Sequence, residues 1–139
     1  MSYLIDSDLI SLAHKKFLPP ALEKWLAHHE AETFISEITI AEMRFGVELA
    51  PESHREILAA QVAATEKIFA AAIERVNLET LLQWKRILAF LKKEKRTVSC
   101  EDTLLAAQCL AAGHMIATNN LKDFRLFASL GLQVVNPLL

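Results

Sequence analysis

The sequence predicts an α/β fold in which short parallel strands alternate with helices. Two observations predict it: short apolar runs recur along the chain, and longer stretches of helical periodicity separate them. Strands joined by helical crossovers lie parallel in one sheet, with the helices packed against it. Ligands of such sheets bind beyond the carboxyl ends of the strands, so functional side chains are expected at that edge.

The expected elements of the first half begin with the apolar run "YLI". They are a strand at 3–5, a short helix through Ala13, a helix opened by Pro19-Pro20 and running to 29, a strand at 32–36, a helix from Ser36 to about Leu49, and an alanine-rich helix from Glu52 to about Ile73. Ser36 is a favoured N-cap residue, and Pro51 interrupts the helix that follows it.

The second half continues the alternation. The expected elements are a brief strand within 74–79, an amphipathic helix from Glu79 into the charged run 91–96, a buried helix within 98–112, a strand at 115–118, a turn at 119–124 entering a helix, and a last strand within 132–137. Gly113 is the expected C-cap of the buried helix, because glycine readily adopts the left-handed conformation found there.

The composition predicts one globular domain over residues 1–139. Of the 139 residues, 53% are hydrophobic and 23% charged, and no low-complexity segment or internal repeat divides them. The net charge of −2 provides no overall basic field, so any nucleic-acid contact must rely on a local patch. The two cysteines match neither a zinc spacing nor a disulfide framework. Without a signal peptide or membrane span, a soluble cytoplasmic protein is expected.

Four acids occupy positions where the pattern predicts burial or a strand end. Asp6 ends the first strand, and Asp123 follows the fourth strand by a short turn. Asp102 shares the helical rhythm of buried Leu105, and Glu42 falls on an apolar stripe of its own helix. That stripe also contains Ile38, Ala41, Phe45 and Leu49. Asp102 and Glu42 are therefore both expected to point inward.

Each acid also has a purely structural explanation. Asp6 or Asp8 could cap the first helix, Asp123 the last one, and Asp102 suits a helix start. Glu42 could form a capping box with Thr39. Taken together, however, four carboxylates at one sheet edge repel each other, and a hard divalent cation such as Mg²⁺ or Mn²⁺ would offset that repulsion. Such a cation activates water and neutralises a phosphodiester. The five histidines show no metal-ligand spacing.

These segments resemble the PIN domain, and in particular the VapC-type toxin nucleases with their FitB-like branch. The resemblance is carried by "YLIDSDLIS" near the start, "SEITIAEMRFGVELA" (36–50), "EDTLLAAQCLAAGHMIATNNLKDF" (101–124) and "VVNP" (134–137). The matching segments follow one another in the expected order and span nearly the whole chain. The segments around Glu42 and Asp123 are the most specific of them.

The resemblance implies a three-layer fold, with a small parallel sheet flanked by helices on both faces. It implies a Mg²⁺- or Mn²⁺-dependent ribonuclease, dimeric and held inactive by a cognate antitoxin protein. By position, Asp6, Glu42, Asp102 and Asp123 match the four family acids. Asp6 and Asp102 are the expected direct metal ligands, and the others complete the site. Thr118 and Asn120 match polar residues expected to order water or phosphate nearby.

The chain departs from the family pattern at three places. Asp8 stands where asparagine is common, which adds a negative charge at the mouth of the site. Asn119 occupies a place often held by arginine, which removes a phosphate contact. No proline precedes the helix of Asp102. These departures are expected to affect which substrate binds and how tightly, more than the class of reaction.

Three other interpretations compete with the nuclease. The Asp6/Asp8 pair resembles the paired acids of HAD-like phosphatases, but Ile10 and the absence of a Gly-Asp pair disfavour that class. A response-regulator receiver needs a phosphorylated Asp at the end of a central strand, and none is found. A non-catalytic module could use the acids to attract a basic partner. The phosphatase interpretation also gives Glu42 no role.

Overall fold

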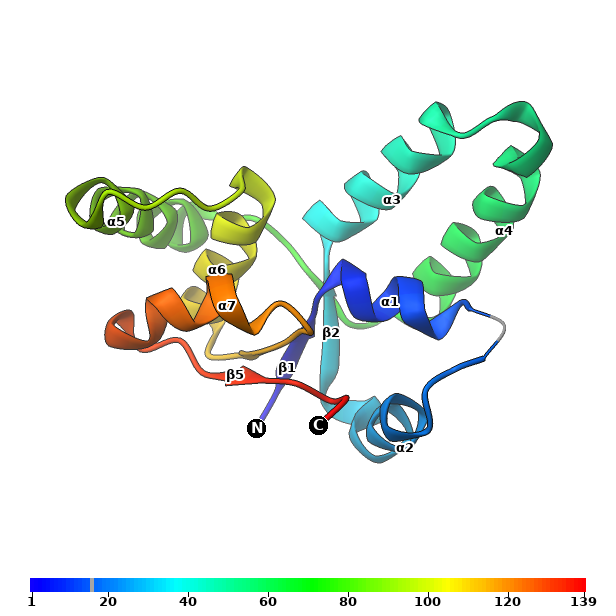
Figure 1. Ribbon diagram of the computed structural model, residues 1–139, viewed down its shortest axis with the longest axis horizontal. Helices are drawn as coiled ribbons and strands as arrows, with labels where there is room; N and C mark the ends of the chain where they lie inside the picture. Colours follow the sequence, from blue (N-terminus) through cyan, green and yellow to red (C-terminus); the bar gives the residue numbers. More distant parts are fainter. Residues whose placement is uncertain (16) are drawn as a thin grey trace.

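A five-stranded parallel sheet forms the centre of the protein in the computed structural model, which describes residues 1–15 and 17–139. The strand order is β3-β2-β1-β4-β5, and all neighbours pair in parallel. The strands are β1 (Tyr3–Ile5), β2 (Thr33–Ser36), β3 (Ile73–Glu74), β4 (Met115–Ala117) and β5 (Val134–Val135). The predicted parallel α/β fold is therefore confirmed, with β1 at the centre of the sheet (Figure 1).

Seven α-helices and two 3₁₀ segments connect the strands within the described residues. The helices are α1 (Ser7–Ala13), α2 (Pro20–His29), α3 (Glu37–Leu49), α4 (Glu52–Ile68), α5 (Leu78–Glu94), α6 (Cys100–Ala112) and α7 (Leu121–Phe124). The 3₁₀ segments are η1 (Glu30–Glu32) and η2 (Arg125–Leu130). Most of these boundaries lie within two residues of the predicted ones.

The end of α4 differs from the prediction. The helix ends at Ile68, whereas the alanine-rich composition predicted it to continue to about Ile73. Ile73 instead pairs with Ile35 as part of β3, and the backbone N–H of Ile35 donates to the carbonyl of Ala72 at 2.9 Å. Pairing with the edge of β2 thus outweighs the local helix propensity of this segment.

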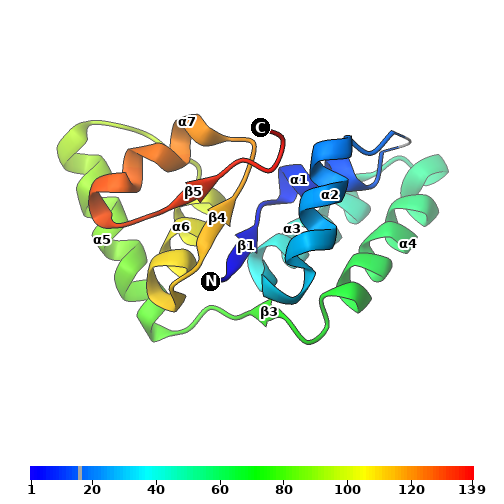
Figure 2. The ribbon, with the colours of Figure 1, turned by 90° about the horizontal axis from the view of Figure 1, so that it is seen from below.

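Helices cover both faces of the sheet. Because side chains alternate along a strand, Leu4 points to one face of β1 while Tyr3 and Ile5 point to the other. The Leu4 face packs against α5, α6 and α7, and the opposite face packs against α1, α2 and α3. Figure 2 shows these two groups of helices on either side of the strands. The predicted three-layer arrangement is confirmed.

Helices α3 and α4 pack against each other as a hairpin that extends away from the sheet (Figure 1). Arg44 and Glu66 form an ion pair across it. The buried side chains of α3 are Thr39 and Ile40, so the predicted buried stripe is wrong. Phe45 is 57% exposed and Leu49 69% exposed, and the other members of the stripe are exposed or half-buried. The apolar periodicity of α3 therefore marks an outer surface rather than the core.

In the part of the chain that the structure describes, no helix has the length and apolarity needed to cross a membrane.

Candidate active site at the carboxyl edge of the sheet

Asp6 directly follows strand β1 and therefore lies at the carboxyl edge of the sheet. The Asp6 side chain is only 5% exposed, and its backbone N–H donates to the carbonyl of Ala117 in β4 at 2.9 Å. Asp6 is also the N-cap of α1, where its Oδ1 accepts a hydrogen bond from the Ser7 N–H at 2.7 Å. Asp6, and not Asp8, therefore caps the first helix.

Thr118, directly after β4, holds the second oxygen of Asp6. Its Oγ1 donates to Asp6 Oδ2 at 2.7 Å and accepts a hydrogen bond from the Asn120 N–H at 2.9 Å. Thr118 is fully buried, and its own N–H donates to the carbonyl of Val135 at 3.0 Å. The pairing of β1 with β4 thus brings together two residues that are far apart in the sequence and fixes the Asp6 carboxylate at both oxygens.

Asp8 lies one residue into α1 and faces the same turn. Its Oδ2 accepts a hydrogen bond from the Asn119 N–H at 3.1 Å, whereas its Oδ1 is buried and has no hydrogen-bond partner among the described residues. Burial and the negative charge of Asp6 raise the pKa of Asp8 to about 6, although the Asn119 N–H opposes the shift. Asp8 therefore belongs to the acidic cluster, and its negative charge is only partly offset by hydrogen bonds.

Helices α6 and α7 bring Asp102 and Asp123 to this edge. The Nδ2 of Asn120 lies 3.3 Å from Asp102 Oδ2 and 3.2 Å from Asp123 Oδ2, so one amide bridges the two carboxylates. The Asp102 N–H donates to Ser99 Oγ, the N-cap of α6, at 3.2 Å. Both acids are half-buried, as the helical pattern predicted for Asp102.

Neighbouring negative charges help to raise the pKa of Asp8 and of Asp102. For Asp102, burial is the largest cause and the charge of Asp6 the next, with smaller contributions from Asp123 and Asp8, and together they raise its pKa to about 6. Burial also raises the pKa of Asp6, against the hydrogen bonds from Thr118 and Ser7. Among the described residues, no lysine or arginine forms an ion pair with any of these four acids. The cluster therefore carries excess negative charge.

A hard divalent cation fits this donor set. The groups are carboxylate and amide oxygens, and the buried, unpartnered Oδ1 of Asp8 is an acceptor that no protein group within the described ranges satisfies. Over those same ranges, no group of three or more His, Cys, Asp or Glu side chains is placed to hold a metal ion. A cation here would therefore have at most two direct protein carboxylates, and waters would complete its coordination, as Mg²⁺ sites allow.

Glu42 is the one predicted site acid that lies apart from this network. It is exposed on the outer surface of α3, and it forms no hydrogen bond or ion pair with the described residues. The expectation that it points inward is wrong, because α3 turns Thr39 and Ile40 toward the core instead. The alternative capping box with Thr39 is also wrong, since Ser36 caps α3 by accepting from the Ile38 N–H at 3.0 Å.

Asn136 is a supporting residue that sequence reasoning missed. Its Nδ2 donates to Asn119 Oδ1 at 3.0 Å, and its Oδ1 accepts from the Leu138 N–H at 3.0 Å. Asn119 in turn donates its backbone N–H to Asp8, so the turn after β5 braces the turn after β4. The only signal in the sequence was the polar residue directly following the last strand.

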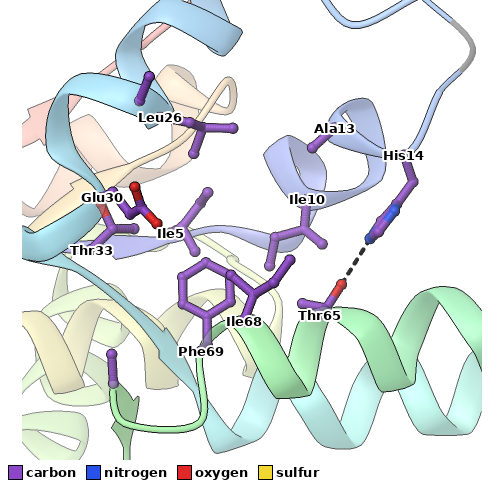
Figure 3. A pocket seen from close by; sticks show the side chains of 12 residues that line it. Ile5, Ile10, Ala13, His14, Leu26, Glu30, Thr33, Thr65, Ile68 and Phe69 are labelled. Carbon is purple, nitrogen blue, oxygen red and sulfur yellow. Dashed lines mark hydrogen bonds between the residues drawn. The ribbon is translucent and has the colours of Figure 1, made fainter.

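A separate apolar cavity of about 400 Å³ lies between α1, α2 and α4, away from the acidic cluster. Its wall includes Ile5, Ile10, Leu26, Ile68 and Phe69 (Figure 3). At its rim His14 Nε2 is hydrogen-bonded to Thr65 Oγ1 at 2.8 Å. None of the candidate acids lines it, so this cavity suits apolar side chains rather than phosphodiester chemistry.

The fold and the site together define a class of protein: a small α/β domain with an acidic cluster at the carboxyl edge of a parallel sheet. The chain belongs to the PIN domain family, whose sequence profile matches residues 3–129. The resemblance drawn from the sequence motifs is thereby confirmed.

Similar proteins cover nearly the whole chain. VapC ribonuclease Y4jK of Sinorhizobium fredii is 28% identical over 138 residues, covering 96% of each chain. Ribonuclease VapC1 of Rickettsia felis is 25% identical over 137 residues, covering 98% of each. Among solved structures, FitAcB from Neisseria gonorrhoeae superposes with a TM-score of 0.84 at 22% identity, over 97% of each chain. VapBC2 from Rickettsia felis, bound to a promoter DNA fragment, has a TM-score of 0.84 at 20% identity and covers 98% of each.

Proposed function

We propose that this PIN-domain protein is a Mg²⁺- or Mn²⁺-dependent endoribonuclease that acts as the toxin of a toxin–antitoxin pair. The observation that carries the proposal is the hydrogen-bonded cluster of Asp6, Asp8, Asp102 and Asp123 at the ligand-binding edge of the sheet. Relatives named as VapC ribonucleases, matched over almost their full length, support the same activity.

In this proposal the catalytic and metal-binding residues are Asp6, Glu42, Asp102 and Asp123. Asp6 and Asp102 hold the cation directly, while Asp123 and the more exposed Glu42 orient water around it. Thr118 fixes the Asp6 carboxylate, and Asn120 keeps Asp102 and Asp123 in one orientation. A bound Mg²⁺ or Mn²⁺ supplies positive charge that offsets the phosphodiester charge and favours ionisation of an attacking water.

The proposed partners are a cognate antitoxin protein, the RNA substrate and a second copy of the chain in a homodimer, all in the cytoplasm. Solved structures of similar fold are described as FitAB or VapBC assemblies, some of them bound to DNA. Two apolar features support a protein partner here. They are the cavity between α1, α2 and α4 and the exposed outer surface of α3, which includes Phe45 and Leu49.

The test is cleavage of a labelled RNA by the purified chain. Cleavage is expected with Mg²⁺ or Mn²⁺, and excess chelator is expected to remove it, because the acidic cluster then lacks its counter-charge. Restoring the metal should restore cleavage. RNA cleavage that persists at full rate in chelator would contradict the proposal. Hydrolysis of a phosphate monoester with no cleavage of RNA would instead favour the phosphatase interpretation of Asp6 and Asp8.

A further inference from the structure

We infer that a basic surface on the α5–α7 side of the protein binds the phosphate backbone of the RNA beside the acidic site. The inference rests on the proposed function, because that function names RNA as the substrate. The basic surface is defined by six exposed cations at the end of α5, directly after it, and on α7 and η2: Lys92, Lys93, Lys95, Arg96, Lys122 and Arg125.

The charges of the chain are divided unevenly along its length. Residues 1–77, which precede α5, contain 7 lysines and arginines against 12 acids, a net charge of −5. Residues 78–139 contain 8 against 5, a net charge of +3, although Asp102 and Asp123 of the site are among those 5 acids. The overall charge of −2 therefore conceals a basic part of the chain, and such an asymmetry is typical of proteins that bind nucleic acid.

Among the described residues, no carboxylate forms an ion pair with any of the six cations. The ion pairs of these residues are formed by His29, Arg44 and His114, all outside the basic surface. The two parts of the surface are held next to each other, because the ring of Phe90 in α5 contacts that of Phe127 in η2 with centroids 6.2 Å apart. Figure 2 shows the end of α5 and helix α7 on the same side of the molecule. The surface therefore offers its charge to a ligand.

Both parts of the basic surface lie close to the acidic site along the chain. Lys122 is next to Asp123 in α7, and Arg96 is six residues before Asp102. Six residues span at most about 22 Å even when fully extended, so a short strand of RNA reaches from these cations to the site. The acidic site repels an anionic polymer, and cations that bind neighbouring phosphates offset that repulsion.

The backbone at Lys95 is an independent observation. Lys95 ends α5 in the left-handed conformation, with φ of 54° and ψ of 44°. It is the only described residue other than glycine with a positive φ, and the other two helical segments that end in this way have Gly113 and Gly131. A Cβ is unfavourable in this conformation, so a lysine makes the end of α5 less stable than a glycine would. A cation at such a position points to a role for its charge.

The first test measures the binding of a labelled single-stranded RNA by fluorescence anisotropy, in chelator so that the RNA stays intact. Lys95→Gly removes a charge and suits the left-handed backbone. We expect this variant to melt about 3 °C higher than wild type, yet to bind RNA about 3-fold more weakly. The slope of log affinity against log salt should fall by about one unit. A more stable variant with unchanged RNA binding would overturn the inference, as would a wild-type protein that binds no RNA at low salt.

Lys67 provides a matched control on the acidic part of the chain. It is exposed in the last turn of α4, as Lys93 is in the last turn of α5. Lys67→Gln and Lys93→Gln each remove a cation from a helix C-terminus, so their melting temperatures should fall by the same small amount. Only Lys93→Gln should weaken RNA binding, by about 3-fold. Equal weakening in both variants would show an effect of net charge alone and would contradict a defined surface.

The second test uses the triple variant Lys93→Gln/Lys95→Gln/Arg96→Gln in single-turnover RNA cleavage with Mg²⁺. The protein concentration that gives half the maximal rate should rise at least about 10-fold. The maximal rate should stay within about 2-fold of wild type, because these cations bind phosphates beside the reacting one. A triple variant that loses binding to polyglutamate but not to RNA would assign the surface to an acidic protein instead and overturn the inference.

The two tests together separate this inference from the proposed function. If the wild-type protein binds RNA through the basic surface but cleaves none in Mg²⁺, the proposed function fails and the binding surface stands. If the wild-type protein cleaves RNA and the triple variant reaches half its maximal rate at the same protein concentration, only the inference fails.

Discussion

On the β1–β4 side of the site, Asp6 and Thr118 are almost fully buried and hydrogen-bonded to each other at 2.7 Å. Glu42, by contrast, is exposed on α3 and forms no hydrogen bond with the described residues. Adjacent parallel strands fix the first pair by their backbone register, whereas Glu42 depends on a helix of the protruding α3–α4 hairpin. A side chain whose rotamer is fixed by packing and hydrogen bonds is preorganised, and the exposed Glu42 side chain has neither kind of support among the described residues.

The largest difference between the two sides is expected from removing one charge on each. Asp6→Asn should lower RNA cleavage at least about 100-fold, because it removes a direct ligand of the proposed cation that is already held in place. Glu42→Gln should lower it by about 10-fold, as expected for a more exposed, water-mediated contact. Single-turnover cleavage at saturating Mg²⁺ measures both. A loss for Glu42→Gln as large as that for Asp6→Asn would show that α3 closes onto the site when metal and RNA bind.

Most features on the side of the site that contains Asp6 and Thr118 could be predicted from local patterns in the sequence. Ser36 as N-cap, Gly113 as C-cap and Asp6 at the end of an apolar run each depend on neighbouring residues only, and all three occur as predicted. The half-buried position of Asp102 also agrees with the periodicity of α6, whose buried residues pack against the sheet. Because parallel strands end at the same edge of the sheet, residues that follow different strands come together there.

The errors concern features that depend on distant parts of the chain. The exposed surface of α3 shows the periodicity of a buried one, because the α3–α4 hairpin extends away from the sheet. The early end of α4 depends on β2, whose free edge accepts Ile73. The bridge from Asn136 to Asn119 joins two turns, and no local pattern predicts it. Local propensity contains no information on such pairings.

Thr118 tests whether preorganisation itself contributes to activity. Thr118→Val keeps the shape but removes the hydroxyl, leaving Asp6 Oδ2 without its donor and Asn120 N–H without its acceptor. We expect a loss of about 10-fold in Mg²⁺ affinity and of about 1–3 kcal/mol in the free energy of unfolding. Calorimetry and urea titration measure the two quantities. Thr118→Ser retains the hydroxyl and should recover most of both, and a serine variant as defective as the valine variant would contradict the role given to this hydrogen bond.

The pH dependence should also come from the buried side of the site. Asp8 and Asp102 have a pKa of about 6 in the folded protein, above the ordinary value of 3.8. Between these values the folded state keeps protons that the unfolded state has lost, so the free energy of unfolding falls as the pH rises through this window. The melting temperature of the metal-free protein should therefore fall as the pH rises from about 4 to about 6. In the double variant Asp8→Asn/Asp102→Asn the melting temperature should depend less on pH than in the control Glu101→Gln, which changes an exposed acid. An equal pH dependence in the two variants would contradict the assignment of this effect to Asp8 and Asp102.

Metal should counteract this loss of stability. Because Mg²⁺ and protons compete for the same carboxylates, Mg²⁺ should raise the melting temperature more at neutral pH than at about pH 5. An equal rise at both values would indicate that Mg²⁺ binds elsewhere on the protein.

The smallest effect is expected on the outer surface of α3, where Leu49 can be compared with the core residue Leu22 of α2. Leu22→Ala, in the core, should lower the free energy of unfolding by about 2–5 kcal/mol, because that side chain is fully buried. Leu49 is 69% exposed, so Leu49→Ala should change it by less than about 0.5 kcal/mol. Urea titration at several protein concentrations measures both. If Leu49→Ala proves as destabilising as Leu22→Ala, and more so as the protein concentration rises, then a second copy covers α3 in solution, and its apolar surface is part of a dimer core.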